Sequence, residues 1–559
     1  MKIENRPMKK LLAVAFLISF APALLAQSGN PLRLEIQAPA GSDPFNYVTA
    51  GKNGVCIFYP TINETGRDSI SWSFMMVNDK LKEEWRKQVP LHEDVTYLKS
   101  LSTTDAIYLL FHDTKRNKDG NILVFMIIPR LQIITEHKGI IPDKAEVVDF
   151  EVSNNYAFIG FNSRKGQPGI IGFSLVTGEK RTYEITTEKD ALLLDIAIDT
   201  TNKTIFATYK IQYASSRNHL YVNQYNSPGT LEKTFDFSEQ VERRNFNSAQ
   251  YIPMGEGDGL VAGTYGYNVS TTRRQYDYYD NYYNSYYYNY YSPYYLRQSN
   301  YDANEDKTPV SDGYFTALIK NGIAGTTKYY NFSNFNNVYK YITNVNALRM
   351  KAKPEKKNDK AEESDQTNTH EDEENDKTLN LRLLKHDIYI NSGQFILTSE
   401  AYSPEYHTNT QMSYDYYGRA FPTSYQVFDG FRYSHAFVAA FDSGGLMTWN
   451  NGMEMRDILT KYLNRKLNCL FENEETTLYY NANNKVAFKT IKGNSIVENT
   501  SYTTLAPVRG TDQHLDEYLG TIEHWYDNFF IATGYESIRN NYLENNKRNV
   551  FYMSKMAFR

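Results

Sequence analysis

Cysteine, tryptophan and histidine are scarce in this chain of 559 residues, which contains two cysteines, four tryptophans and ten histidines. So few cysteines exclude a disulfide framework, a cysteine-rich zinc module and an iron–sulfur protein. An excess of positive charge is also lacking, because the formal net charge is −5. The uniform basic field of a nucleic-acid binder is therefore excluded, and we expect no nucleic-acid partner.

Common catalytic motifs are missing as well. The sequence contains no His-Glu-x-x-His zinc motif, no phosphate-binding glycine loop and no Gly-x-Ser-x-Gly elbow. Segment 112–120 resembles a calcium loop, but Lys115 stands where the first carboxylate ligand belongs, so a hairpin turn is expected there. We expect no cofactor and no metal site. Catalysis by two carboxylates stays open, because a sequence does not show how far apart they lie.

Residues 1–26 predict a secretory signal peptide. Lys9 and Lys10 precede the apolar run 11–20, and small residues lead to a cleavage point before Gln27. No later stretch is long and apolar enough to span a membrane. We therefore expect an exported bacterial protein, in the periplasm, outside the cell or at its surface, with no transmembrane segment after signal cleavage.

What the chain has instead is a recurring pattern of short strands. Each repeat begins with two apolar strands joined by a tight turn. A polar loop then leads to a third strand, and a turn rich in Gly, Asn or Asp leads to a weaker fourth strand. The first strands, such as 122–128 and 191–198, are almost continuously apolar, which predicts burial on both faces. Helical periodicity is almost absent.

The repeat predicts an all-β fold, a β-propeller of about eight four-stranded blades, with seven as the alternative. A period of about 50 residues with four antiparallel strands is typical of this architecture. The last unit lacks one strand, while segment 32–37 is left over near the amino terminus, so we expect that segment to pair with the last blade and close the ring. The units begin near Phe45, Val95, Ala145, Ala191, Phe246, Leu381, Leu463 and Leu515.

Individual residues fit this interpretation. Cys56 and Cys469 lie in apolar runs, which favours buried free thiols over a disulfide. The turn 177–179 and the segment 441–449 resemble blade turns of quinoprotein-like propellers. That resemblance implies the shape of a turn and not a quinone cofactor.

Three segments break the period and predict insertions into a single domain spanning 27–559. Segments 268–312 and 402–434 are rich in tyrosine, of which the chain has 48, and segment 351–377 is a charged linker. We expect these segments to be disordered or of low complexity, and to contribute to no blade. In an antiparallel blade, the loop between the second and third strands and the link to the next blade lie at the same end. All three insertions should therefore leave from one face of the propeller.

That loop-rich face is the predicted binding surface. Tyrosine offers a large contact area and a hydroxyl group at low entropic cost, and it can stack on sugar rings or pack on protein. The other loops of that face carry arginines. The candidate binding residues are Arg67, Arg116, Arg164, Arg217, Arg273, Arg274, Tyr278, Tyr283, Tyr287, Tyr290, Tyr416 and Tyr417.

We therefore expect a protein- or glycan-binding or scaffold module that meets an envelope protein or a glycan through this face. The alternative is a propeller hydrolase or lyase acting on extracellular carbohydrate. The missing motifs favour the binding module over the enzyme. The sequence does not indicate an oligomeric state.

Overall fold

A computed structural model describes the chain from residue 32 to residue 557, with gaps. The gaps are residues 39–44, 67, 114–120, 143–144, 164–166, 188–190, 213–217, 239–243, 256, 268–308, 337, 339–378, 415–416, 462, 473, 506–510 and 543–546. The predicted signal peptide and the charged linker 351–377 therefore lie outside the described residues.

The described strands form eight antiparallel sheets, numbered here as blades in chain order. Blade 1 contains β2 (Asn46–Thr49), β3 (Val55–Gly66), β4 (Ser69–Val77) and β5 (Glu83–His92). Blade 2 contains β6 (Val95–Ser102), β7 (Ile107–Asp113), β8 (Ile122–Ile128) and β9 (Ile133–Gly139). Blade 3 contains β10 (Glu146–Ser153), β11 (Tyr156–Asn162), β12 (Gly169–Ser174) and β13 (Lys180–Glu184). Blade 4 contains β14 (Ala191–Asp199), β15 (Thr204–Gln212), β16 (Asn218–Tyr225) and β17 (Leu231–Asp236).

The other four sheets are built in the same way, with additions in blades 5 and 6. Blade 5 contains β18 (Asn245–Gly255), β19 (Asp258–Gly266), β21 (Gly313–Lys320), β22 (Ile323–Ala324) and β23 (Lys328–Asn331). Blade 6 contains β20 (Val310–Ser311), β24 (Leu381–Lys385), β25 (Tyr389–Asn391), β26 (Gln394–Tyr414), β27 (Ala420–Phe441), β28 (Met447–Glu454) and β29 (Leu459–Thr460). Blade 7 contains β30 (Asn468–Glu472), β31 (Glu475–Ala482), β32 (Lys485–Lys492) and β33 (Ser495–Thr504). Blade 8 contains β34 (Gln513–Tyr526), β35 (Phe529–Arg539), β36 (Lys547–Ala557) and β1 (Arg33–Gln37). Short 3₁₀ turns lie at Gly51–Asn53, Pro129–Leu131 and Phe332–Asn334.

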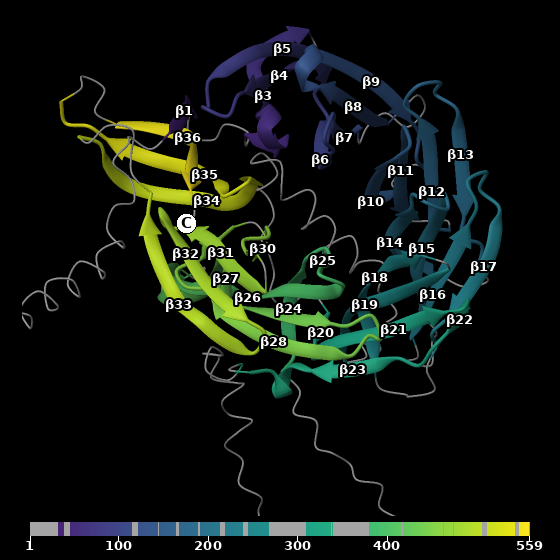
Figure 1. The fold of residues 1–559 in the computed structure, drawn as a ribbon. Helices are drawn as coiled ribbons and strands as arrows, with labels where there is room; N and C mark the ends of the chain where they lie inside the picture. The colour runs from purple at the N-terminus through teal and green to yellow at the C-terminus, as the bar shows by residue number, and fades with distance from the viewer. Residues whose placement is uncertain are drawn as a thin grey trace, which may run out of the picture.

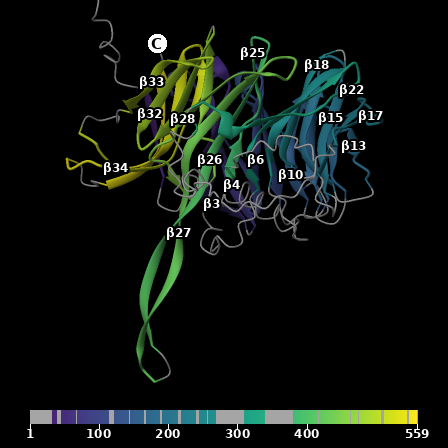
Figure 2. The same ribbon diagram turned by 90° about the horizontal axis from the view of Figure 1, so that it is seen from below.

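The sheets follow one another around a ring, with the first strand of each blade toward the centre (Figure 1). The β-propeller predicted from the sequence is confirmed. Within a blade, consecutive strands pair antiparallel, so the connections between second and third strands all reach one end of the ring. We call this end the long-loop face and the opposite end the tight-turn face. Figure 2 shows β26 and β27 projecting beyond all other strands.

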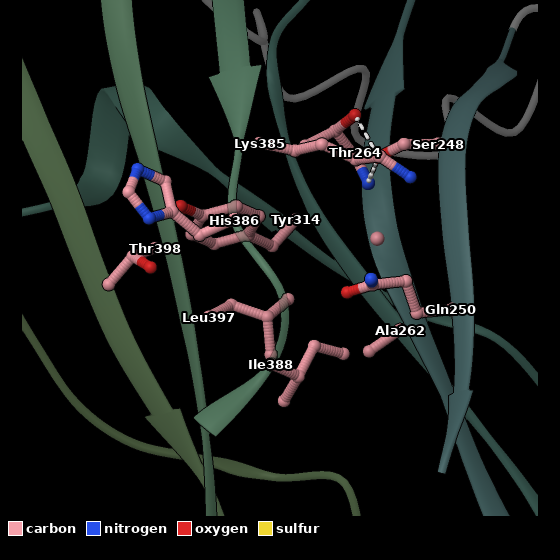
Figure 3. A pocket seen from close by; sticks show the side chains of 11 residues that line it. Ser248, Gln250, Ala262, Thr264, Tyr314, Lys385, His386, Ile388, Leu397 and Thr398 are labelled. Carbon is pink, nitrogen blue, oxygen red and sulfur yellow. Dashed lines mark hydrogen bonds between the residues drawn. The ribbon is translucent and has the colours of Figure 1, made fainter. Parts of the chain in front are cut away.

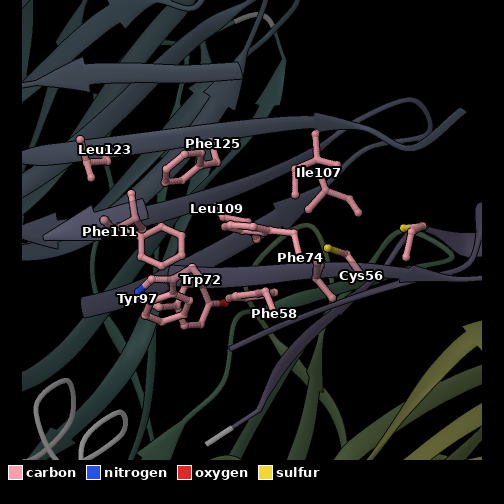
Figure 4. Close-up of a cluster of buried hydrophobic side chains, with 14 of the residues drawn as sticks. Cys56, Phe58, Trp72, Phe74, Tyr97, Ile107, Leu109, Phe111, Leu123 and Phe125 are labelled. Carbon is pink, nitrogen blue, oxygen red and sulfur yellow. The ribbon is translucent and has the colours of Figure 1, made fainter. Parts of the chain in front are cut away.

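Apolar side chains fill the space between each pair of neighbouring blades. Alternate residues of β3 illustrate this arrangement, because Cys56 and Phe58 pack against blade 2 while Val55 and Ile57 pack against blade 8. Figure 4 shows the cluster between blades 1 and 2, where Phe58 and Phe111 meet edge to face. Burial of both faces of each sheet explains why the inner strands read as continuous apolar runs.

The amino-terminal strand closes the ring, as the sequence predicts. All five residues of β1 pair antiparallel with β36, from Arg33 opposite Ser554 to Gln37 opposite Val550. Ion pairs reinforce the pairing, because the buried Arg33 guanidinium contacts both Glu35 and Glu536. It also lies 4.3 Å from the centre of the Tyr552 ring. One cation of β1 thereby joins three strands of blade 8.

Several predicted unit boundaries agree with the structure. Val95, Ala191 and Leu381 are the first residues of β6, β14 and β24.

Both cysteines are free, with Cys56 buried and Cys469 half-buried, and burial raises the pKa of the Cys56 thiol to about 12. The calcium-like segment 112–120 connects the antiparallel strands β7 and β8, although its residues 114–120 lie outside the described ones.

Two predicted insertion boundaries are wrong. Segment 402–434 does not lie outside the blades, because it continues β26 and β27 as a hairpin that pairs residue by residue from Phe395 opposite Phe441 to Tyr414 opposite Ala420. Segment 268–312 ends in β20, which pairs with β24 of blade 6. The hairpin was missed because its outer part is polar and solvated, so it lacks the apolar alternation that marks a strand in sequence. β20 was missed because a strand of two residues is too short to show any periodicity.

The Arg33 ion pairs give a test of ring closure. Replacing Arg33 with alanine leaves the buried carboxylate of Glu536 without its cation, so we expect a loss of about 3 to 5 kcal/mol in unfolding free energy, measured by urea denaturation. The double variant R33M/E536Q removes both charges and should recover most of this loss. Lys52→Ala is the control, because its pair with Asp527 is exposed and should contribute less than about 1 kcal/mol. Equal losses for Arg33→Ala and Lys52→Ala would contradict this account.

Candidate functional site

The structure describes one of the predicted binding residues, Tyr417. It lies at the tip of the β26–β27 hairpin with 78% of its surface exposed, and the Arg419 guanidinium lies 5.3 Å from its ring centre. The remaining predicted residues, Arg67, Arg116, Arg164, Arg217, Arg273, Arg274, Tyr278, Tyr283, Tyr287, Tyr290 and Tyr416, lie outside the described residues.

The root of this hairpin belongs to the core between blades 6 and 7. Tyr402 and Phe431 are buried and meet at right angles with ring centres 5.6 Å apart. Phe428 packs on Phe431 at 5.0 Å, and Tyr406 packs on Phe428 at 5.5 Å. The second tyrosine-rich segment therefore has two parts. Its inner aromatics anchor the hairpin, and the outer part, residues 407–427, projects as a ribbon whose strands pair only with each other among the described residues.

A buried carboxylate, Asp312, ties together the roots of the other two insertions. Its side chain accepts a hydrogen bond of 3.1 Å from the backbone N–H of Tyr267, the last described residue before 268–308. It also accepts from the backbone N–H groups of Leu379 and Asn380, the first described residues after 339–378, at 2.8 and 2.9 Å. Since Arg382 of β24 pairs with Tyr402 at the ribbon root, all three predicted insertions start from one region of the long-loop face.

The inner strands carry charged side chains that the sequence analysis did not select. β6, β10 and β14 each contain a bulge, and Lys99, Asp149 and Asp195 follow these bulges directly. The two aspartates link neighbouring blades. Asp149 accepts a 3.2 Å hydrogen bond from the backbone N–H of Ile196 in blade 4, and Asp195 accepts one of 3.1 Å from Tyr251 in blade 5.

Lys99, Asp149 and Glu151 form a compact group beside the axis of the ring. The Lys99 ammonium donates to Asp149 at 2.6 Å and lies 4.0 Å from Glu151. Burial favours the neutral form of Lys99, but the nearby carboxyl groups of Asp149, Asp387 and Glu151 favour the charged form more strongly. The pKa of Lys99 is therefore raised. Burial and the nearby Asp149 raise the pKa of the Glu151 carboxyl to about 7. Glu151 is thus an acid that keeps its proton close to neutral pH.

A second charged group belongs to blades 6 and 7. Arg465 donates two hydrogen bonds to the Asp387 carboxylate, at 2.9 and 3.1 Å. Neighbouring protein atoms partly desolvate Asp387, but the positive charges of Arg465, Lys99 and Lys385 outweigh this effect and lower the pKa of this exposed carboxyl. Lys99 of blade 2 and Asp387 of blade 6 therefore interact across the centre of the ring.

A small cavity lies between blades 5 and 6, next to these charges (Figure 3). Its volume of about 20 Å³ has room for a single water molecule and for no larger ligand. Burial lowers the pKa of Lys385, and among the described residues the buried Thr398 hydroxyl has no hydrogen-bond partner. The lining residues are Ser248, Gln250, Ala262, Gly263, Thr264, Tyr314, Lys385, His386, Ile388, Leu397 and Thr398.

One sequence signal could have located part of the charged group. Asp149 and Asp195 each interrupt an apolar run, in Val-Val-Asp-Phe and Leu-Leu-Asp-Ile, and a single acid in such a run needs a partner when buried. The convergence of Lys99, Glu151 and Asp387 leaves no such signal, because they come from different blades.

Within the described ranges, no group of three or more His, Cys, Asp or Glu side chains is placed to hold a metal ion. Among the same residues, no helix has the length and apolar character needed to cross a membrane.

Comparisons with known proteins add little to this picture. No family model matches the chain, and no curated protein matches it. Among solved structures, a PL25 ulvan lyase aligns with a TM-score of 0.38 at 7% identity, over 82% of this chain and 90% of its own. The WD40 domain of SCAP from fission yeast aligns with a TM-score of 0.34 at 8% identity, over 93% and 91%. A prolyl endopeptidase aligns at 0.35 and 9% identity, over 97% of this chain and 61% of its own. Likeness this weak supports no conclusion about function, and the propeller assignment rests on the sheet topology.

The raised pKa of Glu151 predicts how stability changes with pH. The pKa of Glu151 is about 7 in the folded chain, against an ordinary value of 4.5, so the folded chain binds this proton more tightly than the unfolded chain. The stability that the bound proton contributes is present at low pH and is lost as the pH rises from about 4.5 to about 7. Glu151→Gln stays neutral throughout. We expect no change in unfolding free energy near pH 4 and a gain of about 1 kcal/mol at pH 8, a small value because the side chain is 36% exposed. Urea denaturation at several pH values measures this difference, and a difference that does not vary with pH would contradict the assignment.

Proposed function

We propose that this protein is an exported bacterial binding or scaffold module that contacts an envelope protein or a glycan through its long-loop face. The observation that carries the proposal is the ribbon of residues 407–427. It extends a blade far beyond the body of the propeller, as Figure 2 shows, and its aromatic root fixes it to the core. The roots of the two other insertions lie beside it.

The composition of the ribbon supports a role in binding a partner rather than in stabilising the fold. A two-stranded ribbon in water contributes little stability of its own. This one nevertheless exposes large apolar side chains, with Met412 57% exposed, Phe421 46% and Tyr425 45%. Aromatic side chains with a polar group are enriched where proteins bind their partners, because they offer a large contact area and lose few rotamers.

Shortening the ribbon tests the proposal. Tyr406 and Phe428 pair directly, so an Asn-Gly turn can replace residues 407–427 and join the strands there. We expect the shortened protein to unfold within about 1 kcal/mol of the parent, because no described side chain among residues 407–427 is fully buried. Capture of the partner in pull-downs from the native cell envelope should be lost. A second variant lacking residues 272–302, in the first tyrosine-rich segment, is expected to lose capture as well.

The control removes apolar surface from the opposite end. Val176 lies in the turn between β12 and β13, and Ile323 is the first residue of β22, directly after the turn that ends β21. Both belong to the tight-turn face with 75% and 71% of their surfaces exposed, so V176S/I323S should keep the partner. A pull-down profile that the shortened ribbon leaves unchanged would argue strongly against the proposal.

A second candidate function is hydrolysis or elimination on an extracellular carbohydrate, and Glu151 favours it. A carboxyl group with a pKa near 7 can donate a proton to a leaving oxygen at neutral pH. Lys99, 4.0 Å away, and the nearby Asp149 would stabilise the charges that change during such a step.

The enzyme hypothesis has its own experiment. The parent protein should release new reducing or unsaturated sugar ends from at least one member of a polysaccharide panel. Glu151→Gln should reduce that rate by about 100-fold or more while leaving the fold intact. Turnover on no member of the panel, or equal turnover by Glu151→Gln, would remove this candidate.

A further inference from the structure

The outer ribbon has two unlike faces, and the strand register assigns each side chain to one of them. Residues that stand opposite each other in an antiparallel pair share a face, and successive residues alternate. From Tyr406 opposite Phe428 to Tyr414 opposite Ala420 the register has no shift. Phe421 and Tyr425 therefore lie on one face, and Met412 lies on the other.

The face with Phe421 and Tyr425 combines an aromatic row with a polar row, and we call it the aromatic face. On β27 it presents Phe421, Thr423, Tyr425 and Val427, and on β26 it presents His407, Asn409, Gln411 and Ser413. Tyr425 follows Phe421 by four residue steps along the strand, which corresponds to a distance of about 13 Å along the ribbon. Hydroxyl and amide groups fill the space between and opposite the rings.

Hydrogen bonds within the aromatic face hold its side chains in place. The Asn409 amide donates to the Tyr425 hydroxyl at 3.1 Å. The Thr423 hydroxyl donates to the Ser413 hydroxyl at 2.9 Å. The Tyr425 ring and these polar groups are thus oriented before a ligand arrives, which lowers the entropic cost of binding.

Charge is confined to the two ends of the aromatic face. At the root, His407 pairs with Asp429 at 2.6 Å, and at the tip Arg419 contacts the Tyr417 ring. Between these ends the face carries only apolar, hydroxyl and amide side chains. A strongly charged partner would find no opposite charge along this stretch.

We propose that the aromatic face of the ribbon binds an uncharged polysaccharide chain. This inference rests on the proposed function and selects a glycan as the partner of the ribbon. The electron-rich faces of Phe421 and Tyr425 attract the polarised C–H groups of sugar rings. The hydroxyl and amide groups between them offer both donors and acceptors to sugar hydroxyls.

A protein partner fits this face less well. Stable protein interfaces bury about 1,000 Å² or more around a contiguous apolar centre. Here Thr423 separates the two exposed rings, and the four residues that β26 presents on this face are all polar. An extended ligand with alternating apolar and hydroxyl surfaces matches this pattern.

Affinity gel electrophoresis with the full-length mature protein tests the proposal. The probes are the neutral polysaccharides laminarin, arabinoxylan, galactomannan and α-mannan, with the anionic polysaccharide alginate for comparison. We expect at least one neutral probe to retard the protein and alginate to have little effect. Phe421→Ala and Tyr425→Ala should each weaken binding to that probe by about 10-fold.

Met412→Ala is the matched control, because Met412 is exposed to a similar degree on the opposite face of the same ribbon. It should bind the neutral probe as the parent does. Tyr425→Phe keeps the ring but loses the hydroxyl group that Asn409 orients, so it should bind more tightly than Tyr425→Ala.

Three results would overturn the inference: retardation by none of the neutral probes, stronger retardation by alginate, or equal weakening by Met412→Ala and Phe421→Ala. The pull-down with the shortened ribbon distinguishes a failure of the glycan proposal from a failure of the proposed binding function. Ribbon-dependent capture of an envelope protein, without retardation by neutral polysaccharide, would leave the binding module intact and reject the glycan as its ligand.

Discussion

Burial of both faces of every blade is the constraint on which the rest of this structure depends. A sheet that is apolar on both sides needs a neighbour on each side, so a row of such blades is stable only when its ends meet. Val55 and Cys56 show this requirement within one strand, because their side chains enter different interfaces. The pairing of β1 with β36 meets it, and the buried Arg33 links the two ends of the chain through charge as well as packing.

Packing is supplemented by charge near the axis, where the first strands converge. Asp149 and Asp195 each accept a hydrogen bond from a backbone N–H group of the following blade, so each fixes the position of that blade in the ring. Buried charges of this kind are costly unless they are paired and hydrogen-bonded. Glu151 lacks so close a partner and keeps its proton to higher pH as a result.

The sequence predicted the propeller well because its signals are local. Apolar runs, turn residues and a missing last strand each lie within one repeat, and they located the starts of β6, β14 and β24 and the closing strand. The ribbon was missed because both of its faces are solvated, so it reads as low complexity. The charged group at the axis was missed because its members lie in blades far apart in sequence. Of the predicted binding residues, Tyr417 alone falls in the described part of the chain, where it is exposed at the ribbon tip. Its role in binding stays a prediction.

Asp312 has a mechanical consequence. Its carboxylate holds the backbone at Tyr267, before the first tyrosine-rich segment, and at Leu379, after the charged segment. A tensile force on either of these two segments would therefore be transmitted to the same pair of oxygen atoms. Because Asp312 directly follows β20, which pairs with β24 of blade 6, while Tyr267 directly follows β19 of blade 5, that force would be shared by the strands of two neighbouring blades.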